Sequence, residues 1–134
     1  MRILIAEDNA DHASIFRQLL SPYGECVVAS DGEAAFKEFC DSWERGEPFG
    51  LICLDVLMPK MNGHETLRAI RKWEAEMGIG GFEGVRVVMT TALEDDENIE
   101  EAIKAGCEGY VFKSAGGKRL LKQLRDLGLI KDTE

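Results

Sequence analysis

Acidic side chains follow two of the most apolar segments of the chain, at positions where a buried strand would end. Asp55 directly follows an apolar run, and Glu7 and Asp8 follow a similar run near the start of the chain. Later, Lys113 follows a third apolar run. A carboxylate at the exit of a buried strand costs free energy unless it is paired, bound to a metal or open to solvent. The three acids and the amine therefore predict one assembled polar site.

The formal charges of these four side chains indicate a divalent cation. Three carboxylates and one ammonium sum to −2, and carboxylates about 4 Å apart repel each other by ~4 kcal/mol at an effective dielectric constant of 20. One divalent ion would neutralise the site, and ligands that are all oxygen favour Mg²⁺ or Mn²⁺ over zinc. The two histidines, His12 and His64, have no partner at the spacing of a helical zinc motif. We expect both on the surface.

A carboxylate that faces a metal ion and an ammonium group is suited to attack a phosphoryl group. The metal and Lys113 would neutralise the phosphoryl oxygens as charge redistributes in the transition state. Thr90 and Thr91 end another apolar segment and could offer a hydroxyl to the same oxygens. An acid after a strand is by itself often a helix cap. The combination of these residues nevertheless predicts phosphoryl transfer at Asp55.

The composition is that of one globular domain. The 134 residues suffice for one core and are too few for two ordinary domains. With 25 acidic and 16 basic residues, the net charge of −9 argues against binding to nucleic acid or to an anionic membrane. The apolar runs are too short to span a bilayer, and we see no signal-peptide pattern at the start. The four cysteines lack C-x-x-C spacing and are expected to be buried free thiols in a reducing cytoplasm.

Apolar runs alternate with amphipathic segments, which predicts an α/β fold: a parallel sheet with helices on both faces. The expected strands are 2–6, 25–29, 50–54, 85–90 and 109–112. The expected helices are about 10–21, 32–43, 63–77, 94–105 and 117–127. Their spacing buries Ile15, Phe16, Leu19 and Leu20 of the first helix, and the fourth helix carries Ile99, Ala102 and Ile103.

Over essentially its full length, the chain resembles the receiver domain of two-component response regulators. The resemblance implies a flavodoxin-like fold, a doubly wound five-stranded parallel sheet of strand order 2-1-3-4-5 with five helices. It also implies a single receiver domain over 1–134, with no output domain. The residues that carry it are Glu7 and Asp8, Asp55 with Met58, Pro59, Asn62 and Gly63, Thr91 and Ala92, and the run from Gly109 to Lys113.

By resemblance, Asp55 is the phosphoacceptor and takes its phosphoryl group from a histidine kinase. Mg²⁺ would be held by Glu7, Asp8, Asp55 and the backbone carbonyl of Leu57. Such a protein catalyses only its own phosphorylation and a slow dephosphorylation.

The resemblance also implies a conformational switch. Thr91 and Lys113 would contact the phosphoryl oxygens, and Tyr110 would be the aromatic residue that turns inward when Thr91 moves toward the phosphate. The fourth helix, fifth strand and fifth helix would then bind a downstream protein target. We expect a monomeric cytoplasmic switch of the chemotaxis type.

Three residues depart from the family pattern. Ser114 stands where the family has a proline after a cis peptide bond. Because a cis bond to a non-proline residue costs ~2.5–4 kcal/mol, we expect a trans bond or a reshaped loop here. Leu57 and Leu93 occupy positions that control the access of water to the phosphoryl group. Since neither side chain can orient a water molecule, we expect slow self-dephosphorylation, over minutes or longer.

Several alternatives stay open or are disfavoured. The chain could be a phosphorelay shuttle to a histidine phosphotransfer protein, the receiver part of a longer regulator, or a receiver that is never phosphorylated. A phosphatase of the haloacid-dehalogenase type would need a second aspartate where Leu57 stands. A flavodoxin-like flavin carrier would need a phosphate loop where the acids of 7–11 stand. The glycine-rich segment 78–84 follows a helix and precedes a strand, the reverse of a phosphate-binding loop.

Overall fold

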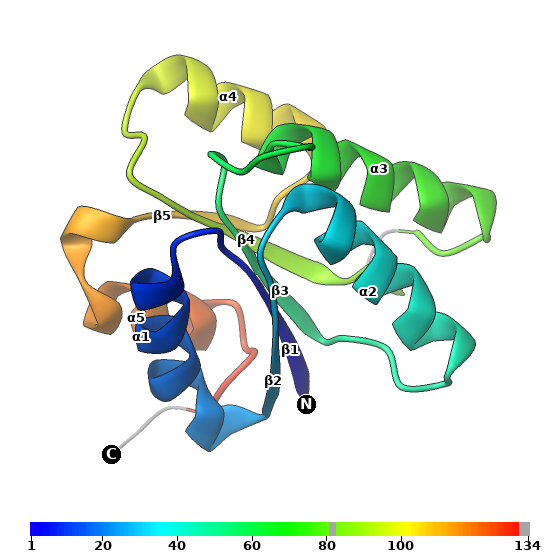
Figure 1. The fold of residues 1–134 in the computed structure, drawn as a ribbon, viewed down its shortest axis with the longest axis horizontal. Helices are drawn as coiled ribbons and strands as arrows, with labels where there is room; N and C mark the ends of the chain where they lie inside the picture. Colours follow the sequence, from blue (N-terminus) through cyan, green and yellow to red (C-terminus); the bar gives the residue numbers. More distant parts are fainter. Residues whose placement is uncertain (81–82, 132–134) are drawn as a thin grey trace.

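The computed structural model describes residues 1–80 and 83–131 and contains a single sheet of five parallel strands (Figure 1). Its order is β2-β1-β3-β4-β5. β1 pairs with both β2 and β3, so that Ile3 lies opposite Cys26 on one side and Leu51 on the other. This order confirms the predicted doubly wound fold. The strands are β1 (Arg2–Ala6), β2 (Glu25–Ala29), β3 (Leu51–Leu54), β4 (Arg86–Thr91) and β5 (Gly109–Phe112).

Helices connect successive strands, and polar side chains fix where most of them begin. The N-caps Asn9, Asp31, Asn62 and Asp95 each accept a hydrogen bond from the backbone N–H three residues later. Short 3₁₀ helices, η1 (Ser21–Tyr23) and η3 (Lys113–Ala115), follow α1 and β5. No helix in the described part of the chain has the length and apolar character needed to cross a membrane. The α-helices are α1 (Ala10–Leu20), α2 (Gly32–Glu44), α3 (Gly63–Glu76), α4 (Asp96–Ala105) and α5 (Gly117–Asp126).

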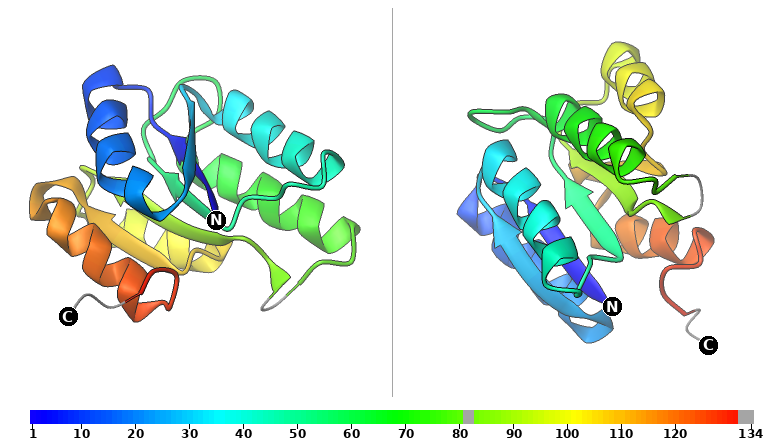
Figure 2. Two further views of the ribbon diagram at one scale, coloured as in Figure 1. Left: turned by 90° about the horizontal axis from the view of Figure 1, so that it is seen from below. Right: turned by 90° about the vertical axis from the view of Figure 1, so that its right-hand side faces the viewer.

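The sheet separates two hydrophobic cores. Helices α2, α3 and α4 cover one face, and α1 and α5 cover the other (Figures 1 and 2). Alternate residues of β1 enter opposite cores: Leu4 packs with the α2–α4 side and Ile3 and Ile5 with the α1–α5 side. Because both faces are buried, the strands are continuously apolar, and polar side chains reach solvent at the strand ends.

The predicted boundaries lie within two residues of the observed ones, but one inward position is wrong. Ile15 is 59% exposed. In α1 the buried positions are Ala13 and Leu20. α4 begins at Asp96 because the side chain of Asp95 caps it. The predicted loop 78–84 falls partly outside the described residues.

The prediction for the cysteines holds in part. All four are free thiols, and burial raises the pKa of the Cys53 thiol to about 12. Cys26 is also buried, whereas Cys40 and Cys107 are only partly covered.

Candidate functional site

The carboxyl ends of the strands bring the predicted site residues to one edge of the sheet. Glu7 and Asp8 follow β1, Asp55 follows β3, and Lys113 follows β5 as the first residue of η3. The backbone N–H of Asp55 donates to the carbonyl of Ala6 at 3.0 Å. The main chain of Asp55 therefore continues the pairing of β1 and β3, which fixes where its side chain leaves the sheet.

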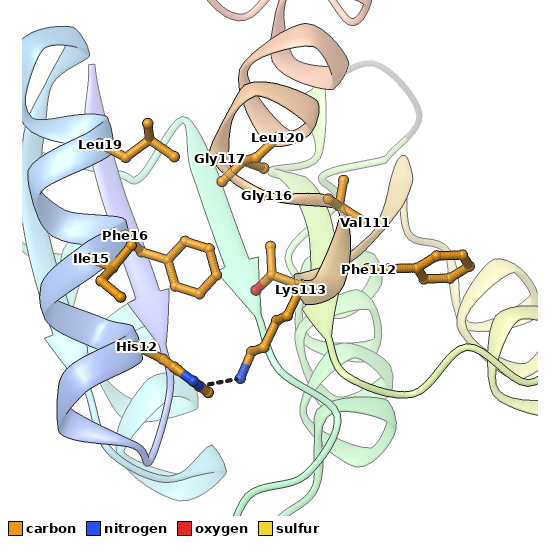
Figure 3. A pocket seen from close by; sticks show the side chains of 11 residues that line it. His12, Ile15, Phe16, Leu19, Val111, Phe112, Lys113, Gly116, Gly117 and Leu120 are labelled. Carbon is orange, nitrogen blue, oxygen red and sulfur yellow. Dashed lines mark hydrogen bonds between the residues drawn. The ribbon is translucent and has the colours of Figure 1, made fainter.

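The Lys113 ammonium group is the central contact of the site. Its Nζ donates to Asp55 Oδ2 at 2.9 Å and forms an ion pair with Glu7 Oε1 at 2.5 Å. The same Nζ lies 3.1 Å from His12 Nδ1 (Figure 3). One cation thus serves two carboxylates, which leaves the three acids with excess negative charge.

The acids form a candidate site for a hard divalent cation. Glu7, Asp8 and Asp55 each place one carboxylate oxygen within 4.8 Å of the others. Glu7 and Asp55 are 2% and 3% exposed, and Asp8 is exposed. All the donors are oxygen, and the open side leaves room for the water molecules that Mg²⁺ keeps. The donor set therefore fits Mg²⁺.

The electrostatics of the site also favour a cation. Burial raises the pKa of Glu7, and the Asp55 charge adds to this, while hydrogen bonds from Lys113 and from the Asn9 N–H only partly offset the burial. For Lys113, burial alone would lower the pKa, but the hydrogen bonds to Glu7 and Asp55 outweigh it and raise the pKa. Lys113 is thus held as a cation, but its hydrogen bond to Glu7 does not fully offset the effect of burial on the pKa of Glu7.

The loop between β3 and α3 is held close to Asp55. The N–H of Gly63 donates to the carbonyl of Val56 at 2.8 Å, and a Cβ at Gly63 would collide with the Asp55 carbonyl. Asn62 starts α3 with a capping box that it shares with Glu65. The sequence pair Asn62 and Gly63 therefore allows the loop to fold back over the strand end.

The predicted switch residues meet in the segment after β4. Thr91 is fully buried, and its Oγ1 accepts a hydrogen bond from the N–H of Leu93 at 3.3 Å. The Tyr110 hydroxyl donates to the Leu93 carbonyl at 2.8 Å, and the Tyr110 ring packs edge-on against Phe112 at 5.8 Å. Both switch residues thus hold the same short segment at the start of α4.

Ser114 links this segment to the end of β5. Its Oγ donates to Glu94 Oε2 at 3.1 Å. Among residues 1–80 and 83–131 no peptide bond is cis, so the bond from Lys113 to Ser114 is trans, as expected.

Both histidines have roles that the sequence did not indicate. His64 is 3% exposed, contrary to the expected surface position, and its Nε2 lies 2.8 Å from Asn98 Oδ1. It joins α3 to α4. His12 is exposed, as expected, but it borders the site through Lys113. His64 and Asn98 are 34 positions apart in the sequence, and His12 and Lys113 are 101 positions apart. Local spacing carries no signal at such separations.

An apolar cavity of about 240 Å³ lies next to Lys113, between α1 and α5 (Figure 3). Phe16 and Leu19 line it from α1, and Leu120 lines it from α5. His12 and Lys113 form its polar end, so the cavity adjoins the site.

The sequence was compared with families of known proteins. The response regulator receiver domain family matches residues 3–125. The chain belongs to this family.

Relatives of the receiver include sensors and regulators that are longer than this chain. It is 30% identical over 115 residues to the osmosensing histidine protein kinase SLN1 of Saccharomyces cerevisiae, which covers 84% of this chain and 9% of that protein. It is 32% identical over 128 residues to the regulatory protein VanRB of Enterococcus faecalis, which covers 95% of this chain and 52% of that protein. The receiver thus spans about half of the regulator and a small part of the kinase.

Solved structures share the fold. The receiver domain of the histidine kinase CKI1 from Arabidopsis thaliana, in complex with Mg²⁺ and BeF₃⁻, has a TM-score of 0.80 and 25% identity, with 95% of this chain and 89% of that chain covered. The CheX–CheY complex from Borrelia burgdorferi gives a TM-score of 0.80 at 21% identity, with 96% and 89% covered. The recognition of a receiver and its flavodoxin-like fold are thereby confirmed.

Proposed function

We propose that this receiver is a phosphorylation-dependent signalling switch whose phosphoacceptor is Asp55. The observation that carries the proposal is the placement of Asp55: it is buried, its Oδ2 is bonded to Lys113, and it lies within reach of two further acids. A carboxylate that is desolvated but cation-paired is available as a nucleophile. The phosphoryl donor is a histidine kinase, as for receivers in general.

The proposed reaction is an in-line displacement. A carboxylate oxygen of Asp55 attacks phosphorus, the bond from phosphorus to the donor imidazole nitrogen breaks, and its electron pair returns to that nitrogen. Lys113 keeps its proton, because its pKa is raised, and its ammonium offsets charge on the phosphoryl oxygens.

Glu7, Asp8, Asp55 and the Leu57 carbonyl would hold Mg²⁺, or Mn²⁺ in its place. Such an ion neutralises charge at the phosphoryl oxygens. Support comes from the all-oxygen acidic cluster and from the Mg²⁺ complex of the Arabidopsis receiver. Asp8 is the exposed member and forms the open side of the site.

The proposed switch acts through Thr91 and Tyr110. When the Thr91 hydroxyl turns to a phosphoryl oxygen, it gives up its bond with the Leu93 N–H. The segment that Tyr110 holds by the Leu93 carbonyl is then free to rearrange. Because this segment leads into α4 and Tyr110 belongs to β5, the change reaches the surface formed by α4, β5 and α5. We propose that this surface binds the downstream protein target.

We further propose that residues 1–134 act as one receiver domain and that this domain is monomeric. The free thiols suit a reducing cytoplasm. The net charge of −9 disfavours nucleic acid and anionic membranes as partners.

The test uses a small phosphoryl donor. Incubation with acetyl phosphate and Mg²⁺ should add one phosphoryl group, detected by intact-protein mass, and Asp55→Asn should abolish it. Asp8→Asn should slow the reaction, whereas Asp11→Asn, an exposed acid in the first turn of α1, should leave it unchanged. Labelling of the Asp55→Asn protein at the wild-type rate would refute the assignment.

A second candidate is a phosphorelay receiver that hands its phosphoryl group to a histidine phosphotransfer protein, alone or as part of a longer chain. It is favoured by the similarity to a histidine kinase many times longer than this receiver. Transfer of label from Asp55 to a histidine phosphotransfer protein, faster than hydrolysis, would support it over the first candidate.

A further inference from the structure

Figure 1 shows α2 and α3 side by side. Residues at and just after their C-terminal ends line a second pocket. Its volume is about 470 Å³. Trp43 and Glu44 line it from α2, Trp73 lines it from α3, and Met77 and Ile79 line it from the segment that follows. Both tryptophans of the chain therefore lie in one pocket.

The aromatic rings of this pocket pack against each other and against the hydrophobic core. The Trp43 and Trp73 rings lie 6.1 Å apart at an angle of 41°. Phe39, which is fully buried, packs edge-on against Trp73 at 5.3 Å. Both tryptophans keep part of their surface exposed. Two anchored rings at an angle form a corner whose π faces are electron-rich.

Negative charge and a soft apolar side chain border this corner. Glu44 lines the pocket, and the cation that follows it, Arg45, is directed instead toward Glu38, with Nη2 3.9 Å from Oε2. Glu76 is exposed one helical turn after Trp73. Met77 is 61% exposed, and methionine is a common residue of adaptable binding surfaces. The pocket thus combines π faces, a carboxylate and apolar contact area.

We propose that this pocket binds an arginine side chain from a basic segment of a protein partner. The planar guanidinium would stack on a tryptophan face and direct its N–H groups to the Glu44 carboxylate, while its methylene stem would cover Met77 and Ile79. Charge complementarity selects this occupant: the Glu44 carboxylate attracts a cation and would repel an acidic segment. The proposal does not depend on phosphorylation of Asp55.

The experiment compares two peptides of the same length and shape. One alternates arginine and leucine, and the other replaces each arginine with citrulline, which is neutral. Binding is followed by the indole N–H signals of Trp43 and Trp73 in ¹⁵N NMR spectra. We expect the arginine peptide to shift both signals and to bind about tenfold more tightly than the citrulline peptide. Equal binding of the two peptides, or unmoved indole signals, would overturn the proposal.

Charge variants on one helix separate a local site from diffuse attraction. Glu44→Gln should weaken the arginine peptide about threefold. Glu33→Gln removes the same charge from the first turn of α2, about 16 Å along the helix, and should leave binding unchanged. Equal losses in both variants would show diffuse attraction only and refute the pocket. Met77→Ser, an exposed position that does not threaten folding, should also weaken binding.

Discussion

At the scale of single residues, the charge of Asp55 is balanced by one ammonium group that also serves Glu7. Lys113 reaches both carboxylates from a position 58 residues beyond Asp55. Its side chain is 15% exposed, and those of Glu7 and Asp55 are 1% and 5% exposed. Removal of one partner from such a group leaves uncompensated buried charge, which is more costly than loss of a surface pair.

Replacement of Lys113 with methionine should therefore destabilise the fold. Without divalent cations, we expect the free energy of unfolding to fall by about 3 kcal/mol in urea denaturation, and Mg²⁺ should restore part of the loss by neutralising the acids. Lys122→Met is the control, because the ion pair of Lys122 with Asp126 is 62% and 58% exposed and should contribute less than about 1 kcal/mol. Equal effects of the two substitutions would contradict this view of the site.

The lifetime of the phosphorylated form should depend on Leu57. This side chain is 56% exposed and cannot orient a water molecule, so we expect self-dephosphorylation over minutes or longer. Leu57→Asn supplies a group that can hold water and should accelerate hydrolysis by up to about 10²-fold. Ile15→Asn, at a similarly exposed apolar position, should not. The decay is measured by mass after removal of acetyl phosphate, and an unchanged decay in Leu57→Asn would count against the role of this residue.

At the scale of elements, Arg71 ties the end of α3 to two other parts of the chain. Its guanidinium donates to the Val85 carbonyl at 2.8 Å, just before β4, and to the Gly106 carbonyl at 2.8 Å, just after α4. It also pairs with Glu74 at 2.8 Å and Glu108 at 2.9 Å. Both acids also accept hydrogen bonds from the main chain at the start of β4. Glu74 accepts from the Val85 N–H, and Glu108 accepts from the Val87 N–H. One planar cation with five donors therefore joins three elements.

Loss of this cation should be more costly than loss of an exposed one on the same helix. Arg71→Met should lower the free energy of unfolding by about 3 kcal/mol, because it leaves the buried Glu74 without its cationic partner. Arg68→Met, which removes an ion pair to Glu101 that is 52% and 48% exposed, should lower it by less than about 1 kcal/mol. The midpoints of urea denaturation of the two variants test this order. A larger loss of stability in Arg68→Met than in Arg71→Met would contradict it.

The sequence predicted the elements and the acidic site, but not the contacts between distant side chains. The spacing of apolar residues located each strand and helix. The rule that parallel strands end at one edge of the sheet correctly predicted that Glu7 and Asp55 lie together. The same spacing wrongly predicted that Ile15 is buried. The apolar residues of a short helix do not show how much of its surface the neighbouring helices cover. It missed the burial of His64, whose partner Asn98 belongs to another helix. Such contacts depend on how helices pack, which no local pattern encodes.

At the scale of the whole molecule, the sheet places a concentration of negative charge at the point where β1 and β3 end. The molecule as a whole carries a net charge of −9, so no general positive field offsets the site. A ligand that binds only the folded protein stabilises it by RT ln(1 + L/Kd), where L is the ligand concentration, so the gain grows with that concentration. A divalent cation at this edge should therefore act on global stability, and the titration of Glu7 should control how strongly it does so.

Stabilisation by Mg²⁺ should grow as the pH rises from the ordinary pKa of Glu7 toward neutral. Burial raises the pKa of Glu7 above its usual value of 4.5. The folded protein therefore binds a proton at Glu7 more tightly than the unfolded chain does. As the pH rises through this raised pKa, ionised Glu7 costs stability in the absence of a cation, and Mg²⁺ removes that cost. With Mg²⁺ at ten times its dissociation constant, the gain at pH 7 should be about 1.4 kcal/mol.

Denaturation in urea at each pH, with Mg²⁺ or with a chelator, gives the increment directly, and the difference cancels titrations that the cation does not affect. Glu7→Gln should reduce the increment and flatten its dependence on pH, since an amide neither titrates nor carries charge. An increment in the wild-type protein that stays constant or falls toward pH 7 would show that Glu7 is not a ligand whose ionisation the cation favours. The buried carboxylate would then be paired by Lys113 alone.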